Sequence, residues 1–269
     1  MDGRGPLVTK LSRFIPLSDE DVRVLDGMCL NEERFKADTD IVREGDVPRS
    51  AFVLTHGMAF RYRFMPDGKR QIFTFMIPGD VFGLHDFLLR AMDHSIIALV
   101  PARLAAISRA TVFDLFEHHP RIGHALWWSA LQEEAINRER IVALGRRSAR
   151  GRVAYLLCEL VWRHRAVGLA EHHTIRLPLT QSELADTLGL TSVHLNRILQ
   201  GFRQGNLIAL ARHQLTLLNV ERLQKIAGFN QDYLHLGGAT TEVRSYIDTL
   251  EHNRTEVCQP AARASPRTH

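Results

Sequence analysis

Residues 177–210 read LPLTQSELADTLGLTSVHLNRILQGFRQGNLIAL, and this stretch decides the fold of the C-terminal half of the chain. Thr180 is followed three residues later by Glu183, which is the spacing of a capping box and predicts a helix over residues 181–188. Gly189 ends that helix, because glycine readily adopts the left-handed conformation found at helix C-termini. A second helix is predicted directly after it, so the stretch has the form of a helix-turn-helix.

The second predicted helix begins after Thr191, a good N-cap residue, and continues to about Phe202. Its leucine, isoleucine and phenylalanine side chains fall on one face at about 100° per residue, which predicts a side that packs on a core. The opposite face is polar and suits a major groove. Arg197 can pair with guanine, Asn196 can pair with adenine, and Ser192 can meet a base edge or a phosphate.

Positive charge is concentrated around this motif. The whole chain has a formal charge of +4, whereas residues 146–228 hold twelve basic residues against five acids, a net charge of +7. A charge excess alone more often marks a solvated surface, but arginine suits phosphate and the helical pattern agrees with that role. Residues 207–218 predict a β-wing with a basic tip. We therefore predict a DNA-binding surface made of Thr180, Thr191, Ser192, Val193, His194, Asn196, Arg197, Gln200, Arg203 and Arg212.

The composition excludes several classes of protein. Among 269 residues, 45% are apolar and 24% are charged, which is too apolar for a disordered chain and leaves enough apolar residues for two cores. Cys29, Cys158 and Cys258 are far apart, so they form no disulfide framework, and we expect each to be a buried free thiol. No segment resembles a membrane span or a secretory signal, which predicts a cytoplasmic protein without a membrane partner.

The N-terminal half is predicted to be a β-roll behind a short capped helix over residues 18–30. The runs AFVLTH, MAFRYRF and QIFTFMI are rich in β-branched and aromatic residues. Pro66-Asp67-Gly68 between the second and third runs is a strong hairpin signal. Regularly spaced short strands of this kind predict an antiparallel roll or barrel.

From about residue 109 to residue 165 the pattern becomes helical, and mostly apolar residues form one long stripe along one side of the predicted helix. A stripe of this length packs either against its own domain or against a second copy of the chain, and the sequence leaves both open. Gly145 and Gly151 around an arginine cluster predict a bend near residues 145–148. The stripe consists of Ile122, Leu126, Ala130, Asn137, Ile141 and Leu144.

The predicted elements follow one another as a roll, a long helix, a bend and a winged helix-turn-helix. In this order the chain resembles the CRP/FNR family of bacterial transcription regulators over roughly residues 14–228. The glycine pattern REGD, THGM, PDGK and IPGDVFG is similar to the family's roll. LTQSELADTLGLTSVHLNRIL aligns with its helix-turn-helix without gaps. The resemblance implies a homodimer through the long helix, bound to palindromic double-stranded DNA and working with RNA polymerase.

The resemblance also gives the fold class and domains that we expect. The fold is α+β, with a cupin-like antiparallel β-roll, a long dimerisation helix and a C-terminal winged helix-turn-helix. The expected domains are the N-terminal helix and sensor roll over 1–118, the dimerisation helix over 119–145, the DNA-binding domain over 146–228, and a partly disordered extension over 229–269.

Departures from the family pattern concern the effector. Members that bind cyclic AMP hold it with a Gly-Glu pair after a Phe-Gly turn and an Arg-Ser pair about ten residues later. Here Leu84 and His94 stand where the glutamate and arginine would be, so we expect weak or no cyclic AMP binding. The N-terminal cysteine cluster of the oxygen sensors is also absent from the sequence, which predicts no iron–sulfur cofactor. The candidate pocket for an unidentified small effector is Phe82, Gly83, Leu84, His85, His94 and Ser95.

Two other functions are weighed against a non-enzymatic DNA-binding regulator. A cupin-like metal enzyme would need three or four convergent ligands, and the histidines of the roll have no fixed ligand spacing, so no metal site is predicted. A nucleotide-responsive scaffold that does not bind DNA would leave the polar face of the second helix unexplained.

Overall fold

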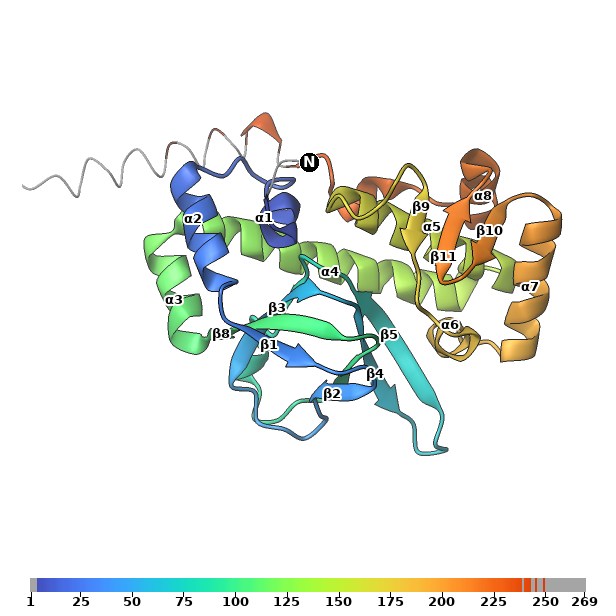
Figure 1. Cartoon of the computed structure of the whole chain (residues 1–269), viewed down its shortest axis with the longest axis horizontal. Coiled ribbons are helices and arrows are strands. Elements are labelled where there is room, and N and C mark those ends of the chain that lie inside the picture. Colours follow the sequence, from blue (N-terminus) through green and yellow to red (C-terminus); the bar gives the residue numbers. More distant parts are fainter. Residues whose placement is uncertain (1–3, 239, 243–244, 246–248, 250–269) are drawn as a thin grey trace, which may run out of the picture.

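The computed structural model describes residues 4–238, 240–242, 245 and 249, and it consists of a β-roll and a helical domain joined by one long helix (Figure 1). The roll is built from two antiparallel four-stranded sheets with strand orders β1-β8-β3-β6 and β2-β7-β4-β5. The predicted roll is thus confirmed. Its strands are β1 (Glu32–Phe35), β2 (Thr39–Val42), β3 (Ser50–His56), β4 (Ala59–Phe64), β5 (Arg70–Met76), β6 (Val81–Phe82), β7 (Ser95–Ala98) and β8 (Ala102–Ser108).

The predicted hairpin joins β4 to β5, and its register runs from the pair Ala59–Met76 to the pair Phe64–Arg70. Its apolar side chains lie in the core: Phe60, Ile72 and Phe75 are all nearly or completely buried. These side chains belong to a core that continues into the helical domain. The roll therefore packs directly against the helix-turn-helix part of the chain.

Helices cover one end of the roll. Helix α2 (Asp19–Met28) confirms the predicted capped helix, because Ser18 and Asp21 form a reciprocal capping box. Helix α1 (Pro6–Leu11) was not predicted, since six residues are too few to show a helical period. A Cβ atom on residue 79 would lie 2.7 Å from the carbonyl oxygen of Pro6, which only glycine avoids. Helix α1 therefore packs closely on the turn that contains Gly79 and Asp80.

The predicted helical region divides into three helices: α3 (Arg109–His118), α4 (Pro120–Arg146) and α5 (Ala149–Ala166). Pro120 occupies the first turn of α4, where proline is tolerated, and it separates α4 from α3. The predicted bend near 145–148 is confirmed, because Arg147 is extended and Ser148 caps α5. Figure 1 shows α4 running along both the roll and the helical domain.

The helical domain is organised around α5, in which every residue from Val153 to His164 is buried. Helix α5 shows no amphipathic stripe because neighbours cover it on all sides. Cys158 is a buried free thiol as predicted, Cys29 is only half-buried, and Cys258 lies outside the described residues. The other elements are β9 (Thr174–Arg176), α6 (Gln181–Leu188), α7 (Ser192–Gln204), β10 (Ile208–Ala211), β11 (Gln214–Leu217), α8 (Val220–Ala227), and the 3-10 helices η1 (Asp86–Leu88) and η2 (Gln231–Leu234).

The core of the helical domain extends past the predicted boundary at residue 228. Phe229 packs edge-on against Tyr155 at 5.1 Å between ring centroids, and Leu234 is completely buried. The start of the predicted C-terminal extension is therefore part of this domain. The disorder expected within this extension, at residues 253–269, concerns residues outside those described. None of the described helices is long and apolar enough to span a membrane.

Candidate nucleic-acid interface

The first helix of the predicted motif, α6, forms as its sequence indicates. The Thr180 hydroxyl donates to the Glu183 carboxylate over 2.8 Å and accepts from the Glu183 backbone N–H over 3.2 Å. Gly189 follows the helix at φ +61°, in the left-handed region that favours glycine. Both hydrogen-bonding functions of the Thr180 side chain are used inside the protein, although its residue surface is exposed. The first role of Thr180 is therefore to cap α6, rather than to contact DNA.

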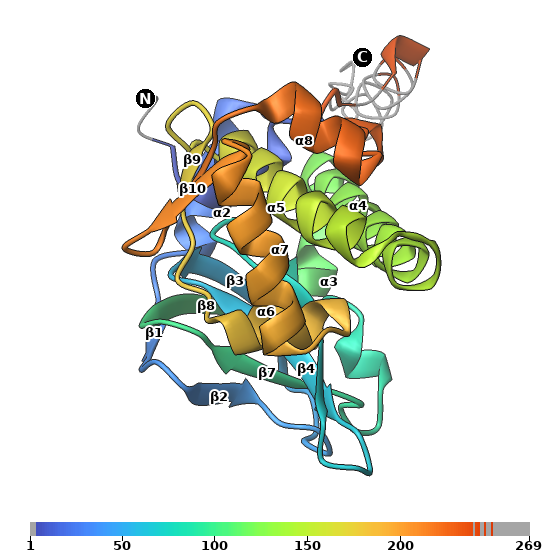
Figure 2. The ribbon, with the colours of Figure 1, turned by 90° about the vertical axis from the view of Figure 1, so that its right-hand side faces the viewer.

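The second helix, α7, is capped by Thr191, whose hydroxyl accepts from the backbone N–H of His194 over 3.2 Å. Leu195, Leu199 and Phe202 are completely buried, which confirms the predicted core side. The opposite side is free within the described part of the chain, and Figure 2 shows α7 facing outward, away from the roll. We call the polar side the recognition face: Ser192, Val193, His194, Asn196, Arg197 and Gln200.

Within the recognition face, the side chains differ in how they are held. Arg197 is exposed, and no acidic side chain of the described residues forms an ion pair with it. Val193 is 64% exposed. Asn196 is half-buried, and its Nδ2 donates to Oε1 of Gln181 in α6 over 2.9 Å. Arg203, predicted to contact DNA, is half-buried, and its Nε is enclosed without a hydrogen-bond partner.

The predicted wing is present as β10 and β11. Arg212 and His213 form its turn, and both have positive φ values, 49° and 59°. Arg212 is exposed there, at the tip. The structure adds a third strand that the sequence did not indicate, β9, which pairs with β11 through Ile175 and Leu215. Three residues are too few for an alternating pattern to show.

The helix-turn-helix also contacts the roll, which the sequence did not predict. Nε of Arg70 on β5 donates to the Asp186 carboxylate of α6 over 2.9 Å. Nε2 of Gln71 donates to the Thr187 carbonyl oxygen over 3.4 Å. The hairpin that joins β4 to β5 therefore holds the first helix of the motif.

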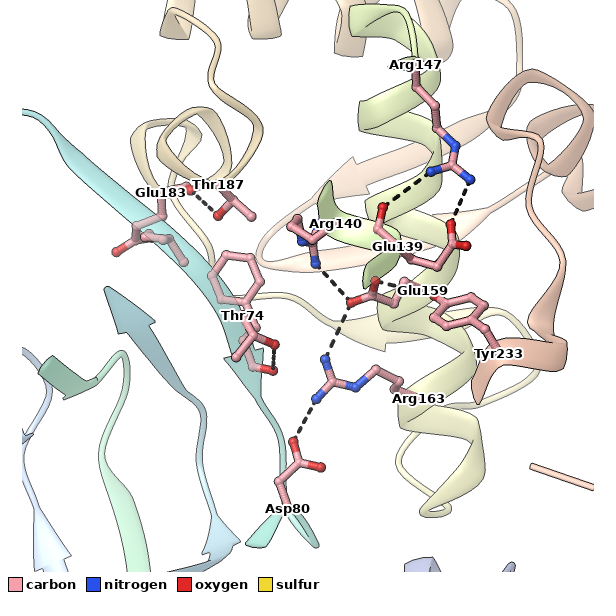
Figure 3. A network of polar contacts seen from close by, with 12 residues as sticks. Thr74, Asp80, Glu139, Arg140, Arg147, Glu159, Arg163, Glu183, Thr187 and Tyr233 are labelled. Atoms are coloured by element: carbon pink, nitrogen blue, oxygen red, sulfur yellow. Dashed lines mark hydrogen bonds and ion pairs between the residues drawn. The ribbon is translucent and has the colours of Figure 1, made fainter. Parts of the chain in front are cut away.

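A buried set of charges lies deeper between the two parts. We call this set the ionic interface: Lys10, Asp80, Arg140, Glu159 and Arg163. Figure 3 labels all of them except Lys10. Asp80, in the turn before β6, accepts from Nζ of Lys10 and from Nη2 of Arg163, each over 2.7 Å. Burial alone would raise the pKa of this carboxyl, but the two cations outweigh it and lower the pKa to about 2.

The ionic interface continues from α5 to α4. Glu159 lies 3.5 Å from Arg163 and 3.1 Å from Arg140 of α4, and it also accepts from the Tyr233 hydroxyl over 3.4 Å. Each charged side chain of the ionic interface exposes at most 12% of its surface. The sequence showed Pro78-Gly79-Asp80 only as a turn, because a partner more than eighty residues away leaves no local pattern.

The structure distributes the residues of the predicted effector pocket over more than one cavity. Phe82 and Gly83 line one cavity at the mouth of the roll. His85 and His94 line another, between β4, β5 and the end of α4. Leu84 packs against an apolar core, and the Ser95 hydroxyl accepts from the Glu44 backbone N–H. Residues 82–85 therefore do not line a single cavity.

The cavity between the roll and α4 has a volume of about 540 Å³. Three guanidinium groups line it, those of Arg61, Arg63 and Arg140, together with His85, His94, Asp86 and Asp93. Nε of Arg61, Nε of Arg140 and Nε2 of His94 are enclosed without hydrogen-bond partners among the described residues. Burial lowers the pKa of Arg61. Within the described part of the chain, no cluster of three or more His, Cys, Asp or Glu side chains could hold a metal ion.

The predicted stripe on the long helix is also corrected. Ile122 and Leu126 are completely buried in the protein's own core, so they cannot meet a second copy. Ala130 is half-buried, whereas Asn137, Ile141 and Leu144 are exposed. Most of the exposed apolar side chains of α4 lie on a neighbouring face that overlaps the stripe only at Ile141. We call it the open face: Trp127, Leu131, Ile141 and Val142. The sequence could not separate the two faces because both are apolar.

Comparison with known proteins matches both halves of this architecture. The model of the cyclic nucleotide-binding domain family matches residues 32–119, which span the roll. The model of the Crp-like helix-turn-helix domain family matches residues 151–226, which include α6, α7 and the wing. The two matches follow one another along the chain, and α4 lies between them.

Relatives and a solved structure agree with these matches. The chain is 29% identical to the nitrogen fixation regulation protein FixK of Bradyrhizobium diazoefficiens, over 72% of this chain and 80% of that protein. It is 28% identical to the transcriptional activator protein FnrL of Cereibacter sphaeroides, over 74% and 81%. The structure of FixK2 from Bradyrhizobium japonicum aligns with a TM-score of 0.67 and 25% identity, over 74% and 98%. These relatives are regulators rather than enzymes, and the chain belongs to the CRP/FNR family of DNA-binding transcription regulators.

Proposed function

We propose that this regulator acts as a homodimer on an operator made of two inverted half-sites, with α7 of each copy in a major groove. One observation carries the proposal: α7 is held by a completely buried apolar side and keeps a polar recognition face open to solvent. Two-fold symmetry of the protein is then mirrored in the DNA, and the half-site centres lie about one helical turn apart.

The division of labour on DNA follows from side-chain chemistry. Arg197 has a free planar guanidinium that can donate two parallel hydrogen bonds to guanine, and Asn196 can bond adenine. Val193 is exposed and can touch a thymine methyl group. Arg212 at the tip of the wing suits the phosphate backbone, which positions the protein without reading sequence.

Selection from random DNA tests this proposal. The full-length protein is incubated with a library of random duplexes, and the bound DNA is sequenced. We expect a two-fold symmetric motif containing a G·C and an A·T pair in each half-site. An asymmetric motif, or enrichment independent of sequence, would contradict the proposal.

We further propose that the open face of α4 is the seam between the two copies. Trp127, Leu131, Ile141 and Val142 are 60%, 39%, 71% and 44% exposed, which is unusual for apolar side chains on one helix of a monomer. Pairing two such faces would remove them from water. The location on the long helix agrees with the arrangement that the family resemblance implies.

A charge placed in the seam tests it. Ile141→Glu puts a carboxylate on the open face without disturbing the protein's own core, so we expect a monomer in sedimentation experiments and loss of operator binding. The control is Leu30→Glu, because Leu30 is 79% exposed but lies outside α4. If Ile141→Glu stays dimeric, the seam lies elsewhere.

The cavity between the roll and α4 supports an effector other than cyclic AMP. The three arginines that line the cavity are each paired with a glutamate, and Asp86 and Asp93 also line it, so none of them is left unpaired for a cyclic phosphate. Leu84 packs against an apolar core and offers no carboxylate for a ribose. We therefore expect titration calorimetry with cyclic AMP to show no saturable binding at millimolar concentration. RNA polymerase remains a predicted partner, on the family resemblance alone.

A further inference from the structure

One hydrogen bond joins the recognition helix to the helix before it. Asn196 lies in the second turn of α7, and Gln181 is the first residue of α6. Nδ2 of Asn196 donates to Oε1 of Gln181 over 2.9 Å, and both side chains are half-buried. Arg197 beside Asn196 is exposed and has no such partner among the described residues. Asn196 is therefore the base-reading candidate whose side chain is already oriented before DNA arrives.

The chemistry of the amide shows what this orientation leaves available. An asparagine side chain has two N–H donors and one carbonyl acceptor. Gln181 takes one of the donors. The remaining N–H and Oδ1 of Asn196 form the donor–acceptor pair that matches N7 and the N6 amino group of adenine in the major groove.

We propose that Gln181 is a positioning residue that fixes the amide of Asn196 and thereby sets its preference for adenine. This inference deepens the proposed function and depends on α7 reading the operator. Without Gln181, the Asn196 amide can rotate about its last bond and present donors in either direction. A donor pair suits the two acceptors of guanine, N7 and O6, so the discrimination between the two purines would fall.

Three substitutions separate positioning from other roles of Gln181. Gln181→Met keeps the length of the side chain and removes the acceptor. Gln181→Glu supplies a group that can only accept, so it holds Asn196 in the same orientation. Gln181→Lys supplies a group that can only donate, so it bonds Oδ1 of Asn196 and turns the N–H donors toward the base.

The measurement is the base preference of each full-length variant on operator duplexes in which one position of the half-site is varied. Asn196→Ala first identifies the position that Asn196 reads, as the one where the adenine preference is lost. At that position we expect Gln181→Met to lower the preference about fivefold, the factor that corresponds to one neutral hydrogen bond. Gln181→Glu should keep the preference within about twofold, while affinity for all sequences falls because a negative charge is added near phosphate.

Gln181→Lys gives the opposite pattern. We expect the preference to move from adenine toward guanine, while the affinity for all sequences rises and the slope of log affinity against log salt steepens by about two, one for each copy in the dimer. Matched controls are Gln204→Glu and Gln204→Lys, since Gln204 is exposed at the far end of α7. These controls carry the same charge changes and should leave the base preference unchanged.

The outcomes distinguish this inference from the proposed function. If Asn196→Ala removes the adenine preference but Gln181→Met and Gln181→Lys leave it intact, Gln181 positions nothing and only this inference fails. If Asn196→Ala changes no preference, Asn196 reads no base, and the inference fails while the preference set by Arg197 still tests the proposed function. If the wild-type protein shows no sequence preference at all, both fail.

Discussion

The recognition face lies on α7 of the helical domain, whereas the ionic interface lies between that domain and the roll, and polar side chains are held in opposite ways in the two regions. On α7 the polar groups are exposed and Arg197 has no ionic partner among the described residues. Between the roll and α5, Asp80 and Arg163 are buried, bonded to each other over 2.7 Å and paired further on both sides. Exposed groups remain free to bind a ligand, whereas buried paired charges fix the position of one part of the protein on another.

This contrast predicts that the two regions fail differently when they are changed. Substitutions in the ionic interface should reduce the stability of the protein and leave base preference intact. Substitutions in the recognition face should change base preference and leave stability intact. The following predictions test the contrast in order of decreasing size.

Asp80→Ala is expected to have the largest effect. It leaves Lys10 and Arg163 buried without their shared carboxylate, and such breaks cost about 3–5 kcal/mol of unfolding free energy. Urea unfolding of the full-length protein measures this loss. Asp67→Ala is the control, because Asp67 pairs with Lys69 on the surface and its removal should be hard to detect. Equal effects of the two substitutions would show that the ionic interface contributes no more than a surface pair.

His164 should make the same region sensitive to acid. Burial lowers the pKa of this imidazole to about 4, while Nδ1 donates to the Leu160 carbonyl oxygen. The unfolded chain takes up a proton below about pH 6.5 and the folded protein does not, so stability falls as pH falls from about 6.5 to 4. Between pH 7 and pH 5 we expect a loss of about 2 kcal/mol.

The test compares urea unfolding of the wild type with that of His164→Asn at both pH values. The asparagine amide can replace the N–H that bonds Leu160 but does not titrate. We expect the wild type to lose about 2 kcal/mol more than the variant on acidification. If both proteins lose the same stability on acidification, His164 is not the cause of the pH dependence.

Thr180 lies at the boundary of the two regions, since α6 contacts the roll and also carries Gln181. Thr180→Ala removes the hydroxyl that caps α6, at a cost of about 1 kcal/mol of unfolding free energy. Thr180→Ser keeps the hydroxyl and should retain most of that stability. If the alanine variant is as stable as the serine variant but binds DNA less tightly, Thr180 acts on DNA rather than on the helix.

The smallest effect is expected at the wing. Arg212→Ala removes one phosphate contact from each copy of the proposed dimer, so affinity should fall alike for all sequences, and the salt slope should decrease by about two. Filter binding at several salt concentrations measures both quantities. A change in base preference at one position would instead show that the wing reads sequence.

Local patterns predicted much of this molecule. The capping box at Thr180, the turn at Gly189 and the split faces of α7 depend on residues within a few positions of one another, so the helix-turn-helix could be placed accurately. The same holds for the hairpin between β4 and β5 and for the bend after Arg146.

Contacts between distant residues could not be predicted in this way. Asp80 meets Arg163 across eighty-three positions, and no spacing rule connects them. The buried side of α4 at Ile122 and its exposed side at Trp127 are both apolar, so the pattern gave the helix but not the face that stays open. The hydrogen bond from Asn196 to Gln181 depends on how α6 and α7 cross, which only the structure shows.

The central claim is that the recognition face reads sequence while the ionic interface only holds it in place. The most direct measurement is the base preference of Arg197→Ala on operator duplexes varied one position at a time. We expect the preference for guanine at one position of each half-site to fall by about 1–3 kcal/mol, with other positions and the free energy of unfolding unchanged. An unchanged preference profile, or an equal loss at every position, would contradict the claim.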